Sequence, residues 1–398
     1  MLVDAKTARH RHDPPALVSI FTLTLCAFSV TTAEFVIAGI LPQVATDLSV
    51  SIPAAGQLVT AYALGMIVGG PLLTLMTVRL PRKPLIVALL GVFILGNLAA
   101  AMAPGYAILL AARAISGLVV ATFFAMAVVI AASLAPAGQQ ASAIAKVALG
   151  FNLAMVVGAP IGTVVGQHFG WRATFLVIVA CATVALMLLA RLVPVRGMPG
   201  TGSVVGELRV LKSRDLQLAL ATTAIGNAGI LMVFVYLSPW LTGMAGLPAD
   251  TIPLLLLVYG IGATLGTLAG GWLSDRALMP AMIGLLGSLA GALLLFGLVG
   301  VRPIPAAIMV FLLGALAFSV VPGLQARVLA TAAGAPTLGI ALNASGFQIA
   351  AALSAWLGGR IIGSNLGLAS LPLVGAVATI AGVFLALASW RRDRKLVP

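Results

Sequence analysis

The stretch TTAEFVIAGILP, residues 31–42, places one carboxylate deep inside an apolar run that begins near Ala16. The hydrocarbon core of a bilayer solvates charge poorly, so an ionisable side chain inside a span usually faces a bundle interior or a water-filled cavity and marks a functional site. The same low dielectric favours the neutral acid, which lets such a group take up and release a proton near neutral pH. Glu34 is therefore the candidate proton carrier.

The apolar composition excludes a soluble fold. Of the 398 residues, 61% are hydrophobic and 8% are charged, whereas a soluble domain has about 25% charged residues. A helix needs about 20 apolar residues to cross a bilayer, so the chain has room for roughly a dozen spans. The apolar runs are continuous and do not alternate, which favours helices over a β-barrel. We predict an all-α integral membrane protein.

Twelve apolar runs predict twelve transmembrane helices. They cover residues 17–41, 54–77, 84–103, 106–134, 141–166, 171–193, 217–241, 252–274, 279–300, 304–329, 337–361 and 368–390. The one long polar connection follows the sixth run. We therefore expect two six-helix halves joined by a central loop, arranged as a tail at 1–16, a first half at 17–193, a cytoplasmic loop at 194–216, a second half at 217–390 and a tail at 391–398.

The net charge of +13 follows the pattern of membrane topology rather than that of nucleic-acid binding. Basic residues gather in the polar segments on one side of the predicted spans, and only Arg172, Arg302 and Arg360 fall on the other. Lys and Arg are enriched in cytoplasmic loops. Both termini are therefore expected in the cytoplasm. The first apolar run is too long for a signal peptide and is interpreted as the first span.

The halves resemble each other weakly. The first and seventh runs end in Leu41-Pro42 and Ser238-Pro239, and the second and eighth end in GGPL at 69–72 and GGWL at 270–273. Two related halves that rock about a midplane site are a common transporter design.

The fifth run carries glycines at four-residue spacing. Gly158, Gly162 and Gly166 share one helix face, and small residues at this spacing let helices approach closely. Pro160 removes a backbone hydrogen bond and bends the helix. Ordinary helix packing and a hinge for alternating access are both compatible with this pattern.

Arg113, in the fourth run, is interpreted as the only basic residue deep in a predicted span. Its long side chain could extend to the membrane interface, because it lies within a turn or two of the outer end. Alternatively, it lies in a cavity and interacts electrostatically with Glu34, which would favour the charged carboxylate and oppose the effect of desolvation. A proton switch requires these two effects to be balanced.

Several polar and aromatic residues within the spans are candidates for a substrate cavity, although each could instead serve helix packing. They are Tyr62, Asn97, Phe123, Phe124, Asn152, Asn227, Tyr236, Asn343 and Gln348. Glu34 is the one acid deep in a predicted span, which argues against a strongly cationic ligand or a sodium site with several carboxylates.

The sequence offers no pattern typical of an enzyme. It has no P-loop for a nucleotide, and no metal-ligand spacing. The histidines His10, His12 and His168 lie in a tail or an outer loop, and Cys26 and Cys181 are interpreted as packing residues. We expect no cofactor; His10 and His12 leave metal binding in the tail as a minor alternative.

The two-half layout, the glycine-proline fifth run and Arg113 before Gly117 resemble the major facilitator superfamily. The closest resemblance is to twelve-span drug:proton antiporters of bacteria, among them chloramphenicol-resistance and sugar-efflux-like exporters. It rests on residues 32–36, 41–42, 47–48, 51–65, 170–175, 275–280 and 333–338, and covers nearly the whole chain.

The resemblance implies roles for individual residues. Glu34 would be the protonatable acid of the first span and Arg113 the arginine that responds to it. Gly158, Pro160 and Gly162 would form the antiporter motif. Gly70 with Arg79, Arg82 and Lys83 would form the cytoplasmic signature loop, opposite Asp275 and Arg276 in the second half; these charges would act as a gate or would simply set topology. The usual acid of the first loop is missing, and Thr74 falls near its place.

The expected function is therefore proton-coupled efflux of a small, largely neutral compound such as chloramphenicol by a monomer in a bacterial cell membrane. Export of a sugar, nucleoside or other metabolite by the same fold is the alternative, and a non-transporting sensor or scaffold is a third class.

Overall fold

The computed structural model describes residues 16–77, 80–134, 140–194, 213–332 and 336–396, and the regular secondary structure in these ranges is helical. Eleven of the described helical segments are long and apolar enough to cross a membrane. The long helix α15, Pro336–Ile362, runs beside them as a twelfth. Helices satisfy their own backbone hydrogen bonds, as a bilayer requires. The predicted all-α membrane fold is confirmed.

The helices form two groups, which we call the first and second helix groups. The first consists of α1 (Ala16–Phe35), α2 (Ile37–Asp47), α3 (Ile52–Thr77), α4 (Arg82–Ala101), α5 (Tyr106–Leu134), α6 (Gln140–Leu153), the π-helical turn η1 (Ala154–Gly158), α7 (Ala159–Phe169) and α8 (Trp171–Leu192). The second consists of α10 (Arg214–Val235), α11 (Leu237–Gly243), η3 (Ala249–Thr251), α12 (Ile252–Arg276), α13 (Leu278–Val299), α14 (Pro303–Thr331), α15, η4 (Leu368–Ser370) and α16 (Leu371–Leu396).

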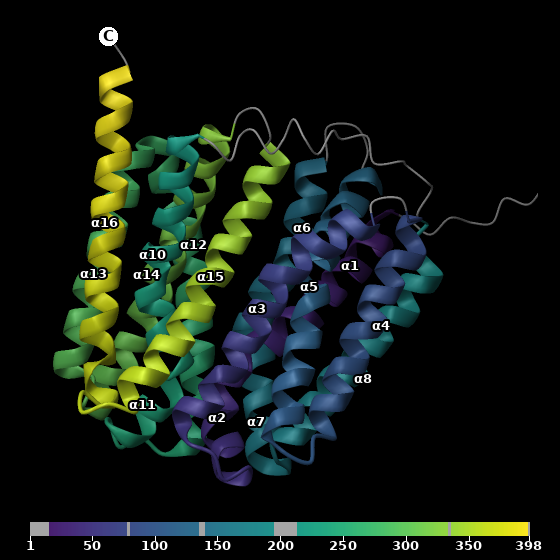
Figure 1. Ribbon diagram of the computed structural model, residues 1–398, viewed down its shortest axis with the longest axis horizontal. Coiled ribbons are helices and arrows are strands. Elements are labelled where there is room, and N and C mark those ends of the chain that lie inside the picture. Colours follow the sequence, from purple (N-terminus) through teal and green to yellow (C-terminus); the bar gives the residue numbers. More distant parts are fainter. Residues whose placement is uncertain (1–15, 78–79, 135–139, 195–212, 333–335, 397–398) are drawn as a thin grey trace, which may run out of the picture.

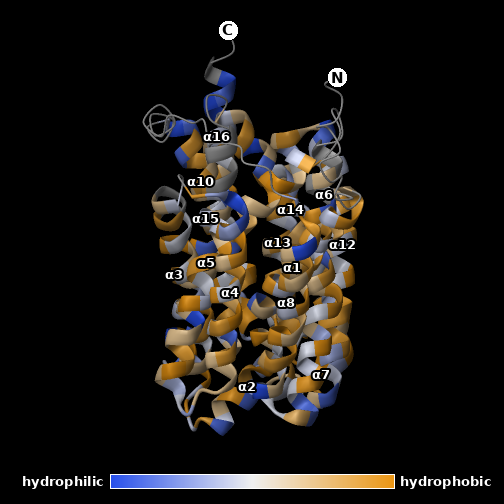
Figure 2. Cartoon of the chain, turned by 90° about the vertical axis from the view of Figure 1, so that its right-hand side faces the viewer, coloured by the Kyte–Doolittle hydropathy of each residue, from blue (hydrophilic) through white to orange (hydrophobic). Residues whose placement is uncertain are grey.

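The two groups stand side by side (Figure 1). Helix α1 begins and α16 ends on the same side of the molecule, which we call the terminal side. Helices α2 and α11 contact each other on the opposite side. Apolar residues cover the middle of the bundle in Figure 2. Large apolar side chains such as Leu268 of α12, Leu353 of α15 and Phe384 of α16 are exposed. This apolar surface suits contact with lipid tails.

The first crossing of each group is broken, which corrects the single spans predicted at 17–41 and 217–241. Helix α1 ends at Phe35 and α2 begins at Ile37, while α10 ends at Val235 and α11 begins at Leu237. A proline follows each break, Pro42 in α2 and Pro239 in α11, and proline bends a helix because it has no N–H to donate. Glu34 therefore lies directly beside a break in its helix.

The glycine face of the fifth crossing packs against the first crossing. Gly158 lies against Thr32, and a Cβ added at Gly162 would stand 2.5 Å from Cγ2 of Val36. The π-helical turn η1 ends two residues before Pro160, which cannot donate to the carbonyl four residues earlier. The close helix contact expected from the glycine spacing is present, and η1 marks a local irregularity of a kind often found at functional sites.

Candidate functional site

A hydrogen bond between the two helix groups lies at Glu34. Glu34 is half-buried near the end of α1, and Gln348 is buried in the middle of α15. Nε2 of Gln348 donates to Oε1 of Glu34 over 2.9 Å. A hydrogen bond to an ionised carboxylate is stronger than one between neutral groups, with a net worth of about 1.5–3 kcal/mol. A contact between the two helix groups thus involves Glu34, the side chain that the sequence predicts to titrate.

Arg113 is buried in α5, with 1% of its surface exposed, so the alternative that it extends to the interface is wrong. Its Nη1 donates to the backbone carbonyl of Ala33 over 2.9 Å, and its guanidinium carbon lies 4.1 Å from the ring centroid of Tyr62. No ion pair joins Arg113 to Glu34, although the structure describes both. The cation therefore supports the backbone beside Glu34 and stacks on an aromatic face.

Phe35, which follows Glu34 in the chain, belongs to a closed set of five ring contacts that we call the aromatic pentad: Phe35, Phe151, Phe318, Tyr259 and Phe234. Taken in that order around the set, successive ring centroids are separated by 5.5, 6.3, 6.5, 4.8 and 5.9 Å. These spacings fall in the favourable range for aromatic pairs. Two rings come from the first helix group and three from the second, so the pentad also joins the groups.

One edge of the pentad is more exposed than the rest. Phe35, Phe234 and Tyr259 are buried, whereas Phe151 and Phe318 are half-buried. Phe151 and Phe318 lie near the middle of their crossings, and Phe234 and Tyr259 lie further toward the opposite side, as their positions in α10 and α12 show. The accessible rings are thus those nearer the terminal side, where a planar apolar ligand could stack on them.

The sequence predicted Glu34 but missed the pentad. None of its five members was among the predicted cavity residues. Of the predicted cavity residues, Asn152 is half-buried and directly follows Phe151. No local sequence pattern identifies the pentad, because its members come from five helices.

Gln348, another predicted cavity residue, contacts Glu34 directly. The remaining ones make contacts elsewhere. Tyr62 lies under Arg113, and Phe123 is buried against Phe124 within the first group. In the second group, Nδ2 of Asn227 donates to the Thr223 carbonyl. Oδ1 of Asn343 accepts a 2.7 Å hydrogen bond from the Thr223 hydroxyl.

Tyr236 lies toward the opposite side, where its hydroxyl donates to the Ala355 carbonyl over 2.7 Å. The hydrogen bonds of Asn227, Asn343 and Tyr236 link helices or cap their own backbone. These contacts match the packing alternative for the three residues.

Comparison with known proteins identifies the fold family. Residues 23–339 match the sequence profile of the Major Facilitator Superfamily. The chain belongs to this superfamily. It is 34% identical over 385 residues to the MFS-type transporter YfhI of Bacillus subtilis (strain 168), with 97% of each chain covered. It is also 34% identical to the inner membrane transport protein YdhP of Escherichia coli (strain K12), over 95% of this chain and 97% of that one.

Two further comparisons bear on function and fold. A chloramphenicol resistance protein of Streptomyces lividans is 33% identical, with 89% of this chain and 91% of that protein covered. A crystal structure of a bacterial homologue of the human lysosomal transporter Spinster superposes with a TM-score of 0.72 at 17% identity, over 94% of this chain and 95% of that one. The superfamily and these relatives are transporters, so the chain is a membrane transporter and not an enzyme.

Within the described residues, the predicted gate residues form no ion pair with one another. Arg79 lies outside the described residues, Gly70 is half-buried in α3, and Arg82 and Lys83 begin α4. Asp275 is exposed, and no ion pair links it to Arg82 or Lys83.

Arg276, the next residue, lies over the ring of Trp272, with 3.3 Å between its guanidinium carbon and the centroid. The contact partner of this arginine is thus an aromatic ring on its own helix. In the described part of the chain, these loop charges stand apart in this conformation.

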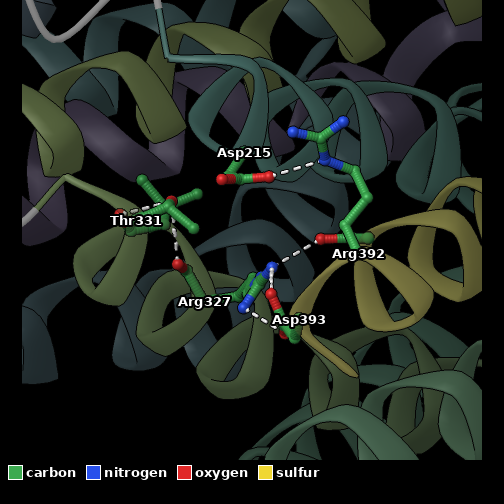
Figure 3. A network of polar contacts seen from close by, with 7 residues as sticks. Asp215, Arg327, Thr331, Arg392 and Asp393 are labelled. Atoms are coloured by element: carbon green, nitrogen blue, oxygen red, sulfur yellow. Dashed lines mark hydrogen bonds and ion pairs between the residues drawn. The ribbon is translucent and has the colours of Figure 1, made fainter. Parts of the chain in front are cut away.

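Two basic residues inside helices were misread from the sequence. Lys146 is half-buried in α6, so Arg113 is not the lone basic residue of the spans. Arg327, expected among the topology-setting basic residues at the cytoplasmic end of the span 304–329, is buried within α14, which continues to Thr331. It holds Asp393 of α16 through two hydrogen bonds of 2.8 and 2.9 Å and Ser389 through one of 2.7 Å (Figure 3).

The described residues contain no cluster of three His, Cys, Asp or Glu side chains that could hold a metal ion. His10 and His12 lie outside the described ranges. Cys26 and Cys181 are both free thiols in the first helix group.

Proposed function

We propose that this transporter exports a small, largely neutral aromatic compound in exchange for protons. The terminal side faces the cytoplasm in this proposal, as the distribution of Lys and Arg favours. The proton gradient drives export, and no cofactor is needed. The membrane is the bacterial cell membrane, and one chain suffices because it supplies both helix groups.

The observation that carries the proposal is the position of Glu34. Its side chain is half-buried, accepts a hydrogen bond from the other helix group and precedes a member of the aromatic pentad. A change in its charge therefore acts on the contact between the groups and on the surroundings of a bound ligand together. That combination is what coupling between a proton and a substrate requires.

The pentad supports an uncharged aromatic substrate. Its five rings offer apolar faces, and aromatic pairs gain about 0.5–1.5 kcal/mol beyond the burial of area. Among the acids that the structure describes, Glu34 alone lies in the middle of a crossing, and the others lie at helix ends or in loops. Chloramphenicol, which has a neutral nitrophenyl ring, is the leading candidate, and the name of the Streptomyces lividans relative supports it.

The proposed cycle is alternating access. On the outside, Glu34 takes up a proton and the substrate leaves. On the inside, substrate binding displaces the proton, with the buried Arg113 cation favouring the charged carboxylate. Proton and substrate compete, and a ligand can shift the conformational equilibrium only by its differential affinity for the two states.

The fifth crossing is the proposed hinge. Gly158 and Gly162 allow the first and fifth crossings to slide in close contact, and Pro160 with η1 gives the helix a place to bend. The basic loop with Arg79, Arg82 and Lys83 and the turn with Asp275 and Arg276 would approach each other when the terminal side closes.

The test is accumulation of labelled chloramphenicol in cells that express the wild-type protein, Glu34→Gln or Asp250→Asn. Asp250 is an exposed acid on the opposite side and serves as the matched control. Accumulation should be low with wild type and the control, should rise when the gradient is collapsed, and should be high with Glu34→Gln at equal expression. Full resistance with Glu34→Gln would remove the proton-carrier role. No effect of the wild-type protein would remove the drug and favour a metabolite, to be sought with labelled sugars and nucleosides.

A further inference from the structure

A groove that contains one arginine lies at the seam between the two helix groups near the opposite side of the molecule. It is lined by Pro53, Ala54 and Gln57 of α3 and by Trp356, Gly359 and Arg360 of α15. Its volume is about 270 Å³. This groove is far along the helices from Glu34, since Arg360 lies twelve positions beyond Gln348 in α15.

The charge of the groove is positive. Arg360 is exposed, forms no ion pair with any residue that the structure describes, and is the charged residue among those lining the groove. Its guanidinium carbon lies 5.6 Å from the ring centroid of Trp356. Gln57 adds an amide from the facing helix. The planar guanidinium matches the oxygens of a phosphate, which it binds through two parallel hydrogen bonds.

Between the groove and the middle of the molecule, both helices present apolar side chains to the outside. On α15, Ile349, Leu353 and Leu357 are 39%, 56% and 40% exposed and share a face with Trp356 and Arg360. On α3, Leu64 and Val68 are 51% and 54% exposed.

These side chains form an apolar track along the seam that ends at a cation and an indole. Tryptophan is typical of the membrane interface, where its polar edge meets the headgroups. The order of these groups matches that of a phospholipid, whose acyl chains lie toward the middle of the bilayer and whose phosphate lies at its surface.

We propose that the groove binds the phosphate headgroup of an anionic phospholipid, whose acyl chain lies along the exposed side chains of α3 and α15. In the orientation proposed above, this lipid belongs to the outer leaflet; the site itself does not depend on that orientation. A free phosphate would use the same arginine but would gain nothing from the apolar track.

The lipid would also favour one arrangement of the two helix groups. The groove needs α3 and α15 together, and a Cβ at Gly359 would lie 3.2 Å from both Gln57 Nε2 and the Pro53 carbonyl oxygen. A ligand that bridges both helices binds best when they are in contact, so it stabilises the arrangement closed on the opposite side.

Native mass spectrometry of the purified full chain tests the proposal. The protein is mixed with equal amounts of phosphatidylglycerol and phosphatidylcholine, and bound lipid is counted for wild type, Arg360→Gln, Arg360→Lys and Arg302→Gln. Arg302 is an exposed arginine on the same side but outside the groove, and is the matched control. Wild type and the control should prefer phosphatidylglycerol by about fivefold, the effect of one arginine near an anionic surface. Arg360→Gln should lose the preference, and Arg360→Lys should keep part of it.

Other results overturn the proposal. Equal loss in Arg302→Gln would show general surface attraction. An unchanged preference in Arg360→Gln, with Arg360→Lys also unchanged, would place lipid binding elsewhere. Binding of glycerol phosphate that depends on Arg360, without any lipid preference, would make the groove a site for a free anion. None of these measurements depends on transport. A failure of the chloramphenicol test would therefore leave their outcome unchanged.

Discussion

Gln348 of α15 donates to Glu34 of α1 across the boundary between the two helix groups, with 2.9 Å between Nε2 and Oε1. An ionised carboxylate accepts such a hydrogen bond about twice as strongly as a neutral acid does. Protonation of Glu34 would therefore weaken one tie between the groups. This relationship gives the proposed coupling a physical basis, because the proton changes how firmly the groups are held together.

The first prediction concerns Gln348→Leu, which keeps the volume and removes the amide. Proton-coupled transport in liposomes should lose most of its dependence on pH, because Glu34 no longer has its partner in the other group. The loss of a charged hydrogen bond, about 1.5–3 kcal/mol, corresponds to a shift of roughly ten- to a hundredfold in the balance between conformations. The rate of substrate-driven proton movement between pH 6 and pH 8 measures it.

Gln167→Ala is the control for that variant. Gln167 also bonds across the groups, to the carbonyl of Ala249, but it lies on the opposite side and does not touch Glu34. Its loss should alter the rate without altering the pH dependence. A pH profile for Gln348→Leu that matches wild type would contradict the role of the bond.

The second prediction concerns the aromatic pentad. Phe318→Ala should weaken binding of an aromatic substrate by about two- to tenfold, from the loss of one aromatic contact. Phe311→Ala, on the same helix but 38% exposed outside the pentad, should leave binding unchanged. Isothermal titration of the purified variants measures the dissociation constants. Equal effects at the two positions would mean that the pentad serves packing alone.

The sequence was sufficient to predict the membrane fold and to single out Glu34 as a carboxylate within a crossing. A carboxylate in an apolar run is visible without any partner, because its cost in a bilayer is a property of one position. The glycine face of the fifth crossing was likewise predictable, since Gly158 and Gly162 are spaced by helical geometry alone. Their packing against Thr32 and Val36 is what that spacing requires.

The partners of these residues were not predictable in the same way. Gln348 is 314 positions from Glu34, and the pentad draws on five helices, so both depend on how the helices are placed and not on local pattern. Arg327 was expected to be a topology-setting charge, because it lies near the end of the predicted span 304–329. Asp393 and Ser389, which bury it, lie in the last helix.

The third prediction concerns the glycine face. A Cβ at Gly162 would stand 2.5 Å from Val36 Cγ2 and 3.2 Å from Thr174 Cγ2, so Gly162→Ala must push the crossings apart. Overpacking of this kind costs about 1–3 kcal/mol. A Cβ at Gly91 in α4 meets nothing within 4 Å, and Gly91→Ala should be neutral or stabilise by about 0.5–1 kcal/mol. Thermal unfolding in detergent measures both. A melting temperature for Gly162→Ala at or above that of Gly91→Ala would show that the helix contact accommodates an added methyl group without strain.

The fourth prediction concerns Arg327 and Asp393. Arg327 is buried and bidentate, so a double-mutant cycle with Arg327→Ala and Asp393→Ala should show a coupling energy of about 0.5–3 kcal/mol in unfolding. The matched control is the Arg172–Asp47 pair, whose side chains are 40% and 48% exposed. Exposed pairs give about 0.2–1 kcal/mol. A coupling energy for Arg327 and Asp393 below that of the control would mean that Ser389 and water replace the lost carboxylate.

The last prediction concerns pH and the opposite side of the molecule. The Arg172 guanidinium, together with the Trp171 indole N–H at 2.9 Å, holds the pKa of the Asp47 carboxyl below its usual range. The unfolded chain then binds this proton more readily than the folded one. The contribution of Asp47 to stability is therefore complete above the ordinary aspartate pKa of about 3.9 and is lost as the pH falls through the lower folded pKa.

The partners are about half exposed, so this contribution is at most about 1 kcal/mol. Asp47→Asn should lower the melting temperature in detergent at pH 6, and the difference from wild type should shrink toward pH 3. Asp250→Asn, at an exposed acid outside any ion pair in the described ranges, should follow wild type at both pH values. A difference for Asp47→Asn that stays constant across this window would mean that the carboxyl acts by shape and hydrogen bonding rather than by charge. The tie between α2 and α8 would then hold equally well in acid.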